Sequence, residues 1–326
     1  MGNFTDIEKQ FNTRIEPIIA NLTASSTVMM NPQKVQADID QAIQNELAKF
    51  RFEKMAAITN ITGRNLICYV SAWLQSTNQN PELSINDNDM NGFMNAVSQL
   101  DRSKGLDLFL HTPGGIVTAT ESVVTYLRKM FNGDIRVIVP HMAMSAGTMI
   151  ACASKEIIMG KESSLGPIDP QYRGVPAQGV EKEFMQALNE TMQSPNKSLI
   201  WKEIISQYRP TFVGECRNVI QLSSDLVTDW LTSGMFKNSK DKEIKAKKIL
   251  DELLNHDASK VHDRHYDYEK CKDLGLKVTP LEKNQALQDN VLSLYHLYFL
   301  SIYRLKSVLK FIENQEGQTI TMFGAR

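Results

Sequence analysis

Short apolar runs alternate with amphipathic segments in the first half of the chain. Four such runs occupy residues 66–70, 106–110, 135–139 and 156–159. Runs this short and this apolar are typical of strands that are covered on both faces. Between them, apolar residues recur at helical spacing in residues 90–100 and 123–131, which predicts amphipathic helices. The alternation predicts an α/β core with a mostly parallel sheet, either doubly wound or coiled into a spiral of strand–helix turns.

The flanking segments are predicted to be mainly helical. Residues 35–54 are rich in good helix formers. The helices expected after Pro170 occupy residues 176–193, 195–208, 214–231 and about 282–313. Leucines spread around the last of these, where they would pack in a core or in an oligomer contact. We therefore expect an N-terminal helical extension over residues 1–64, a core over 65–280 and a C-terminal helical extension over 281–326.

Composition excludes several classes of protein. The 326 residues include 36 Lys and Arg against 37 Asp and Glu, so the net charge is −1, and 42% of the residues are hydrophobic. These values are ordinary for a soluble globular protein and exclude a disordered or collagen-like chain. A charge balance this even gives no long-range attraction to phosphate. Nucleic acid is therefore not an expected partner.

Cysteine usage and hydropathy indicate a cytoplasmic protein. The four cysteines lie far apart and form no C-x-x-C pair, which argues against a disulfide framework or a zinc knuckle and favours reduced thiols. Residues 1–16 mix charged and apolar side chains, unlike a signal peptide. The apolar stretch 291–305 contains His296 and Arg304 and is shorter than the ~20 residues that a membrane span requires. We expect no integral membrane segment.

Two loops directly after predicted strands carry candidate chemistry. The first runs from His111 to Gly115, and its adjacent glycines, Gly114 and Gly115, leave backbone N–H groups uncovered. No Gly-Lys-Ser/Thr follows, so the loop is not a nucleotide phosphate loop of the Walker kind. The simplest alternative for this loop alone is a tight strand-to-helix turn.

The second loop, residues 140–148, places Ser145 among small residues before a helical run. A serine at a strand-to-helix elbow exposes its hydroxyl, and the following amide, that of Ala146, lies at a helix N-terminus. A plain helix-capping serine is the alternative interpretation. If the two strands are neighbours, the Gly115 and Ala146 N–H groups would converge on one carbonyl oxygen beside Ser145. Acyl transfer requires that geometry.

The stretch LHTPGG together with VIVPHMAMSAGTMIACASKEIIMGKESSLGPIDPQ resembles the ClpP/crotonase superfamily, and within it the SppA-like serine dehydrogenase proteinases. The resemblance is dense from Leu66 to Gln171. It implies a spiral of strand–strand–helix units, here with added N- and C-terminal helices, a homo-oligomer, and a serine peptidase that needs no metal or cofactor. It also implies Ser145 as nucleophile and an oxyanion hole formed by Gly114, Gly115 and Ala146.

The general base is not fixed by a short motif. ClpP-type enzymes carry a histidine in the region that corresponds to residues 163–171, and this chain has Asp169 there instead. SppA-like enzymes use a lysine from a later helix. Lys197 shares the predicted apolar face of Trp201, where partial desolvation would make it a base. Lys202 points about 100° away and is the second choice.

Histidines offer further candidates. His262 and His265 precede a segment that resembles the part of the superfamily that packs back on the core, and an imidazole has a suitable intrinsic pKa. Their spacing with Cys271 matches no standard zinc pattern, so we expect no metal. Direct contacts with the substrate are predicted for His111, His141 and Asp169.

These observations favour a serine endopeptidase that hydrolyses peptide or unfolded protein through an acyl-enzyme on Ser145. Two alternatives remain. One is a catalytically inactive module of the same fold that oligomerises or holds peptides, which the missing post-serine histidine would explain. The other is a crotonase-like acyl-CoA enzyme, which requires basic groups near the pocket, and none is evident around Gly115.

Overall fold

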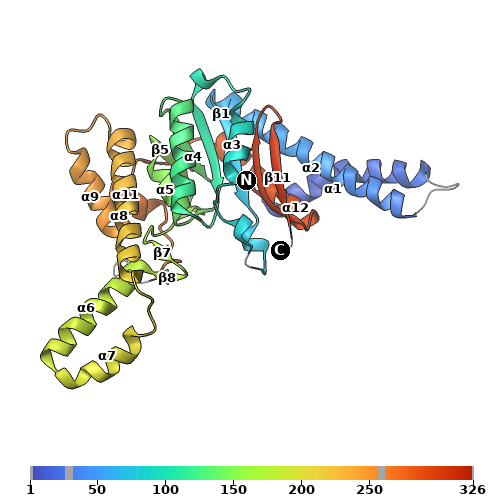
Figure 1. Cartoon of the computed structure of the whole chain (residues 1–326). Helices are drawn as coiled ribbons and strands as arrows, with labels where there is room; N and C mark the ends of the chain where they lie inside the picture. The colour runs from blue at the N-terminus through green and yellow to red at the C-terminus, as the bar shows by residue number, and fades with distance from the viewer. Residues whose placement is uncertain (1–2, 26–31, 79, 256–260, 325–326) are drawn as a thin grey trace.

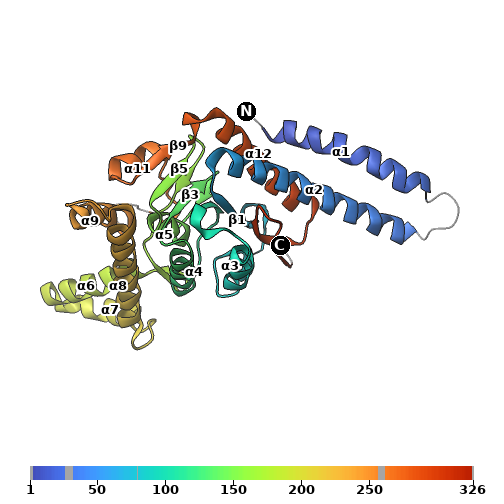
Figure 2. The same cartoon turned by 90° about the horizontal axis from the view of Figure 1, so that it is seen from above.

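The computed structural model describes residues 3–25, 32–78, 80–255 and 261–324 (Figure 1). A central sheet is covered by helices on both faces. A helical hairpin extends from one side of this body, and a second helical arm extends from the other (Figures 1 and 2).

Seven strands form the main sheet, in the order β11-β10-β1-β2-β3-β5-β9. Their bounds are β1 Asn65–Ser71, β2 Leu106–His111, β3 Ile135–Val139, β5 Glu156–Met159, β9 Val278–Pro280, β10 Val308–Asn314 and β11 Thr319–Phe323. The five strands from β1 to β9 pair in parallel, whereas β10 and β11 are antiparallel. The predicted α/β core and its first four strands are therefore confirmed.

Shorter strands form two small sheets of two strands each, apart from the main sheet. They are β4 Met142–Ala143 paired with β6 Ser164–Leu165, and the hairpin of β7 Gln171–Tyr172 with β8 Val175–Pro176. The chain passes from β3 through β4 into helix α5, Ala146–Cys152, which is the strand–strand–helix unit of the expected spiral. An isolated bridge joins Thr112 to Ala143, so the loops after β2 and β3 are tied together.

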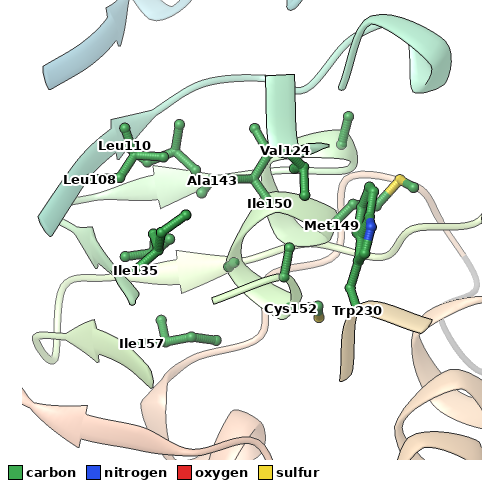
Figure 3. Close-up of a cluster of buried hydrophobic side chains, with 14 of the residues drawn as sticks. Leu108, Leu110, Val124, Ile135, Ala143, Met149, Ile150, Cys152, Ile157 and Trp230 are labelled. Atoms are coloured by element: carbon green, nitrogen blue, oxygen red, sulfur yellow. The ribbon is translucent and has the colours of Figure 1, made fainter. Parts of the chain in front are cut away.

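Alternating residues of the strands face two separate cores. Leu108 and Leu110 of β2 pack in a core with α3 Asp89–Val97, α4 Val117–Met130 and α5 (Figure 3). Phe109, between them, packs in the core beneath α2 Pro32–Thr62 and α12 Gln285–Arg304. Burial on both faces explains why these strands are continuous apolar runs.

Helix α1, Phe4–Ser25, packs antiparallel to α2 and also contacts α12 (Figure 2). Ile7 and Phe11 of α1 meet Leu47 and Phe50 of α2 in a small core of their own. The helical character predicted for the N-terminal extension is confirmed.

The second arm consists of α6 Ala177–Gln193, a short 3₁₀ turn η4 Pro195–Lys197 and α7 Ser198–Ile205 (Figure 1). It joins the body through α8 Phe212–Trp230, whose Trp230 reaches the core (Figure 3). Large apolar side chains stay exposed on the arm, among them Met192, Leu199 and Ile200. The expected homo-oligomer stays a prediction.

The remaining elements are short or follow the arm. They are η1 Trp73–Gln75, η2 Pro81–Leu83, η3 Arg102–Lys104, the π-helix η5 Leu231–Met235, α9 Lys242–Leu253, α11 Tyr268–Leu274 and η6 Leu281–Lys283. Among the residues that the structure describes, no helix is both long enough and apolar enough to cross a bilayer.

The C-terminal prediction was wrong in one part. Helix α12 ends at Arg304, and the chain then forms the hairpin β10–β11 instead of continuing as a helix to residue 313. Strand β10 pairs antiparallel with β1. Its charged residues Lys310 and Glu313 are fully buried and meet partners that lie far away in the sequence. Long-range pairing of this kind overrides a local helical pattern.

An ionic network joins the chain before β1 to β2 and β3. Arg64 donates to Asp107 and to Asp134, each at 2.8 Å, and Arg136 also donates to Asp107. The hydrogen bond from Arg64 lowers the pKa of Asp134 to about 2, from an ordinary value of 3.8. The ionised form of Asp134 therefore stabilises the fold above pH ~4, and this contribution is lost as the pH falls toward 2.

We expect Asp134→Asn to lower the free energy of unfolding at pH 7 by at most about 1 kcal/mol, because the side chain is 41% exposed and solvent screens the pair. The difference from the wild type should shrink below pH 4 and vanish near pH 2. Thermal melts across this range measure it. Asp251→Asn, at an exposed carboxylate, is the control, and a pH-independent Asp134→Asn effect would contradict the expectation.

Candidate active site

Ser145 lies in a strained turn between β4 and α5. Its φ of 52° and ψ of −115° are unusual for a residue other than glycine. Such strain persists only where the surroundings enforce it, and it is often found at functional positions. Ser145 occupies the N-cap position of α5, yet its side chain makes no capping hydrogen bond. The plain capping interpretation therefore does not account for this serine.

The loop after β2 lies against this turn. A Cβ atom added to Gly114, whose φ is 99°, would lie 2.7 Å from the Met144 carbonyl oxygen and 2.8 Å from the Ser145 Cβ. Real Cβ atoms do not approach so closely, so only glycine allows the two loops to meet here. The Thr112 N–H donates to the Met142 carbonyl at 3.1 Å, and the Met144 N–H donates to the Thr112 carbonyl at 3.0 Å.

Two main-chain amides remain available beside Ser145. The Ala146 N–H is the first of α5, and the Gly115 N–H follows the glycine that contacts Ser145. Within the described ranges, neither amide donates a hydrogen bond to another protein group. Both are therefore free to donate to a carbonyl oxygen bound from outside.

His262 and Asp169 form a hydrogen-bonded pair. The His262 Nδ1 lies 2.9 Å from the Asp169 Oδ1. The aspartate side chain is 2% exposed and the imidazole 28% exposed, so the carboxylate is buried while the ring remains accessible in part. A buried carboxylate beside Nδ1 favours the tautomer that carries the proton there and leaves Nε2 as an acceptor.

A cavity of about 350 Å³ connects this pair to the two loops. Its lining includes Trp73, Pro113, Met144, His262 and His265. Pro113 precedes Gly114, and Met144 precedes Ser145, so His262 shares this cavity with a residue of each loop. We call this space the His262 cavity.

A family model described as the ClpP-like SDH-type serine proteinase matches residues 82–319. The chain belongs to this family. The match includes both loops, Asp169 and His262, and it confirms the resemblance and the ClpP-like fold inferred from the sequence.

Two uncharacterised proteins of Methanocaldococcus jannaschii are similar to this chain. MJ0137 is 31% identical over 210 residues, which are 64% of this chain and 64% of the relative. MJ1495 is 29% identical over 212 residues, which are 64% of this chain and 62% of the relative. The chain thus spans somewhat less than two thirds of the length of either relative.

In this member of the family, His265 lines the His262 cavity but pairs differently from His262. Its Nδ1 lies 2.9 Å from the Ser164 hydroxyl. No three His, Cys, Asp or Glu side chains within the described ranges gather as a metal site would require. Cys271, the third member of the zinc pattern considered above, is buried beside the Tyr266 carbonyl.

His111 ends β2 and His141 follows β3, and their rings stack 5.7 Å apart. His111 is 1% exposed, and burial lowers its pKa to about 3, so the ring is neutral. A side chain buried this deeply does not fit the direct substrate contact expected from the sequence. His141 is partly exposed, and its Nδ1 lies 2.8 Å from the Tyr295 hydroxyl.

The two candidate lysines lie elsewhere. Lys197 is 50% exposed and forms an ion pair with Glu190 at 3.1 Å, and Lys202 is exposed. Their elements, η4 and α7, lie on the projecting arm, away from α5 in both views (Figures 1 and 2). The predicted burial of Lys197 was therefore wrong, because the apolar stripe of α7 covers part of the arm and not the core. Within one chain, the structure does not bring either lysine to Ser145.

The His262–Asp169 pair is the feature that sequence reasoning missed. Both residues were considered, but in separate roles, because 93 positions separate them. The one local signal was an acidic residue fixed between Pro167 and Pro170 where a base was expected. No pattern along the chain indicates which histidine would reach it.

The close approach of Gly114 gives a test of the loop contact. We expect Gly114→Ala to destabilise the fold more than Gly133→Ala, by roughly 1–3 kcal/mol, because only the first methyl group would overlap other atoms. Gly133 is the matched control, since its φ of 73° is also positive but nothing lies within 4 Å of an added Cβ. Chemical denaturation measures both, and equal losses would contradict the contact.

Proposed function

We propose that this protein is a serine endopeptidase that cleaves peptide or unfolded protein through an acyl-enzyme on Ser145. His262 acts as general base, Asp169 orients it, and the Gly115 and Ala146 N–H groups form the oxyanion hole. The observation that carries the proposal is the His262–Asp169 pair, which opens onto the same cavity as the Ser145 loop. Membership of the serine proteinase family supports it.

The chemistry follows from these positions. The His262 Nε2 accepts the Ser145 proton as Oγ attacks the peptide carbonyl, and the two amides stabilise the negative oxygen of the tetrahedral intermediate. The C–N bond then breaks, and the imidazolium gives its proton to the leaving amine. A water molecule, deprotonated by the same imidazole, attacks the acyl-enzyme and releases the carboxylic acid and the free serine.

The present arrangement is an open one. No hydrogen bond between Ser145 and His262 is seen among the described residues, so the ring must approach the hydroxyl when substrate binds. In enzymes without substrate, catalytic hydrogen bonds often form only when substrate binds. The ring is partly exposed and faces a cavity, which leaves room for this movement.

The loop from His111 to Gly115, which carries the proposed oxyanion donor, is called the oxyanion loop. Its surroundings favour a peptide over an acyl-CoA as substrate. On the side of Gly115, a second cavity of about 560 Å³ is lined mainly by apolar side chains, including Ile85, Ile116, Val219 and Leu222. No Lys or Arg lines it among the described residues, whereas the phosphates of CoA need such groups. The His262–Asp169 pair offers a candidate base, which weakens the main motivation for the inactive-module alternative.

The first test concerns the nucleophile. We expect Ser145→Ala to abolish both labelling by a fluorophosphonate and hydrolysis of an unfolded protein substrate such as casein, because both reactions require the Ser145 hydroxyl as nucleophile. Gel fluorescence and peptide release measure the two effects. Unchanged labelling in the variant would rule out Ser145 as the reactive group.

The second test concerns the base. We expect His262→Ala and Asp169→Asn each to lower kcat by about 10²–10⁴-fold, because the first removes the proton acceptor and the second its orientation. Steady-state peptide hydrolysis measures this. Lys197→Ala, Lys202→Ala and His265→Ala are the matched controls and should change kcat by less than about threefold. A large loss in Lys197→Ala with full activity in His262→Ala would instead place the base on the arm.

A further inference from the structure

Ile85 forms two main-chain hydrogen bonds to the segment that carries Gly115, the proposed oxyanion donor. We call these two hydrogen bonds the brace. The Ile85 N–H donates to the Gly114 carbonyl at 2.7 Å, and its carbonyl accepts from the Ile116 N–H at 2.9 Å. Gly115 therefore lies between two hydrogen bonds made by a single neighbour. The fit is close, because a Cβ added to Gly115 would lie 2.3 Å from the Ile85 carbonyl oxygen. The direction of the Gly115 N–H thus depends on where Ile85 is held.

A buried ion pair holds both chain neighbours of Ile85. The Lys310 Nζ donates to the Ser84 carbonyl at 2.9 Å and to the Asp89 Oδ1 at 2.6 Å. The other Asp89 oxygen, Oδ2, accepts from the Asn86 N–H at 3.1 Å. Lys310 and Asp89 side chains are both 0% exposed. The cation thus fixes the residue before Ile85, and the carboxylate fixes the residue after it.

Further contacts complete the environment of this pair. The Tyr69 hydroxyl donates to the Asp89 Oδ2 at 2.8 Å, and the Lys310 ammonium lies 5.2 Å from the centre of the Tyr69 ring. Burial lowers the pKa of Lys310, and the adjacent carboxylate opposes this shift. Both charges lose their hydration, so the pair is weak evidence of stabilisation by itself. Apolar residues of similar volume often stabilise a fold as well as a buried ion pair does, so the hydrogen bonds of this pair to the backbone point to a role in placing the backbone.

We propose that Lys310 and Asp89 are positioning residues that hold Ser84 and Asn86 so that Ile85 fixes the Gly115 amide beside Ser145. This inference rests on the proposed function, in which that amide belongs to the oxyanion hole. It makes the site depend on the hairpin β10–β11, because Lys310 of β10 donates a hydrogen bond to the Ser84 carbonyl.

The effect expected follows from the geometry of an oxyanion hole. Donors must lie about 2.7–3.1 Å from the developing oxyanion, and removing one donor costs about 10²–10³-fold in kcat. Releasing the brace would displace the Gly115 donor without removing it. We therefore expect a loss of about 10–100-fold in kcat with less than about a threefold change in KM, because the hole acts in the transition state.

The experiment uses the double variant Lys310→Met/Asp89→Asn, which removes both charges and leaves neither one buried alone. The matched control is Arg51→Met/Glu313→Gln. Arg51 and Glu313 form another buried ion pair, at 2.8 Å, and Glu313 lies on β10 with its side chain toward α12. Each variant removes a buried ion pair that has one member on β10. Only the first removes groups that hold the residues on either side of Ile85. Tyr69→Phe is a milder variant in case the double variant does not fold.

Three readouts separate positioning from stability: the melting temperature, kcat and KM for peptide hydrolysis, and the affinity for a peptide boronic acid, whose tetrahedral adduct occupies the oxyanion hole. We expect both double variants to lose stability. Only the Lys310 variant should lose kcat and boronate affinity, each by about 10–100-fold, with Tyr69→Phe showing a smaller loss in the same readouts. Equal kcat in the two double variants would overturn the proposal.

A fourth readout does not require turnover. Hydrogen exchange of residues 112–117, followed by mass spectrometry, should be at least about tenfold faster in the Lys310 variant than in the Arg51 control, because the loop loses its brace. A wild type without peptidase activity would contradict the proposed function. Unchanged exchange in the Lys310 variant would contradict this inference, whether or not the wild type is active.

Discussion

The contact between two main-chain loops is the constraint on which the whole site depends. Parallel pairing of β2 and β3 brings the loops after them to the same edge of the sheet, and main-chain hydrogen bonds between Thr112 and the Met142–Met144 segment draw them together. Gly114 then lies where no side chain fits. The strained conformation of Ser145 follows from this packing, because the turn has to pass the glycine and still begin α5.

Buried carboxylates are the second constraint on the site, because they hold their partner residues in place. A carboxylate that loses its hydration has to be paired and hydrogen-bonded, and the partner is thereby fixed in place. Asp169 orients the His262 ring in this way, and Asp89 places Lys310 and the Asn86 amide. The same principle that makes these groups costly to bury makes their geometry precise, which is what a catalytic site requires.

The sequence was informative where structure is local. Apolar runs of five residues predicted β2 and β3, and the glycine and serine loops followed from their ends. The hairpin strand β10 escaped prediction because its charges, Lys310 and Glu313, are satisfied by distant partners that a local pattern does not contain. For the same reason, the pattern along the chain did not predict the His262–Asp169 hydrogen bond, although each residue was a candidate by itself. The burial predicted for Lys197 was wrong because an apolar stripe on a helix does not indicate which neighbouring element covers it.

The choice between a lysine and a histidine base follows from environment. A lysine becomes a base only when desolvation removes its proton at neutral pH. Lys197 is half exposed and paired with Glu190, so it is not desolvated. An imidazole needs no such burial, only an orienting acceptor on one nitrogen and access to substrate on the other. Asp169 offers the acceptor and the His262 cavity offers the access, and for this reason we propose the histidine, and not an arm lysine, as the base.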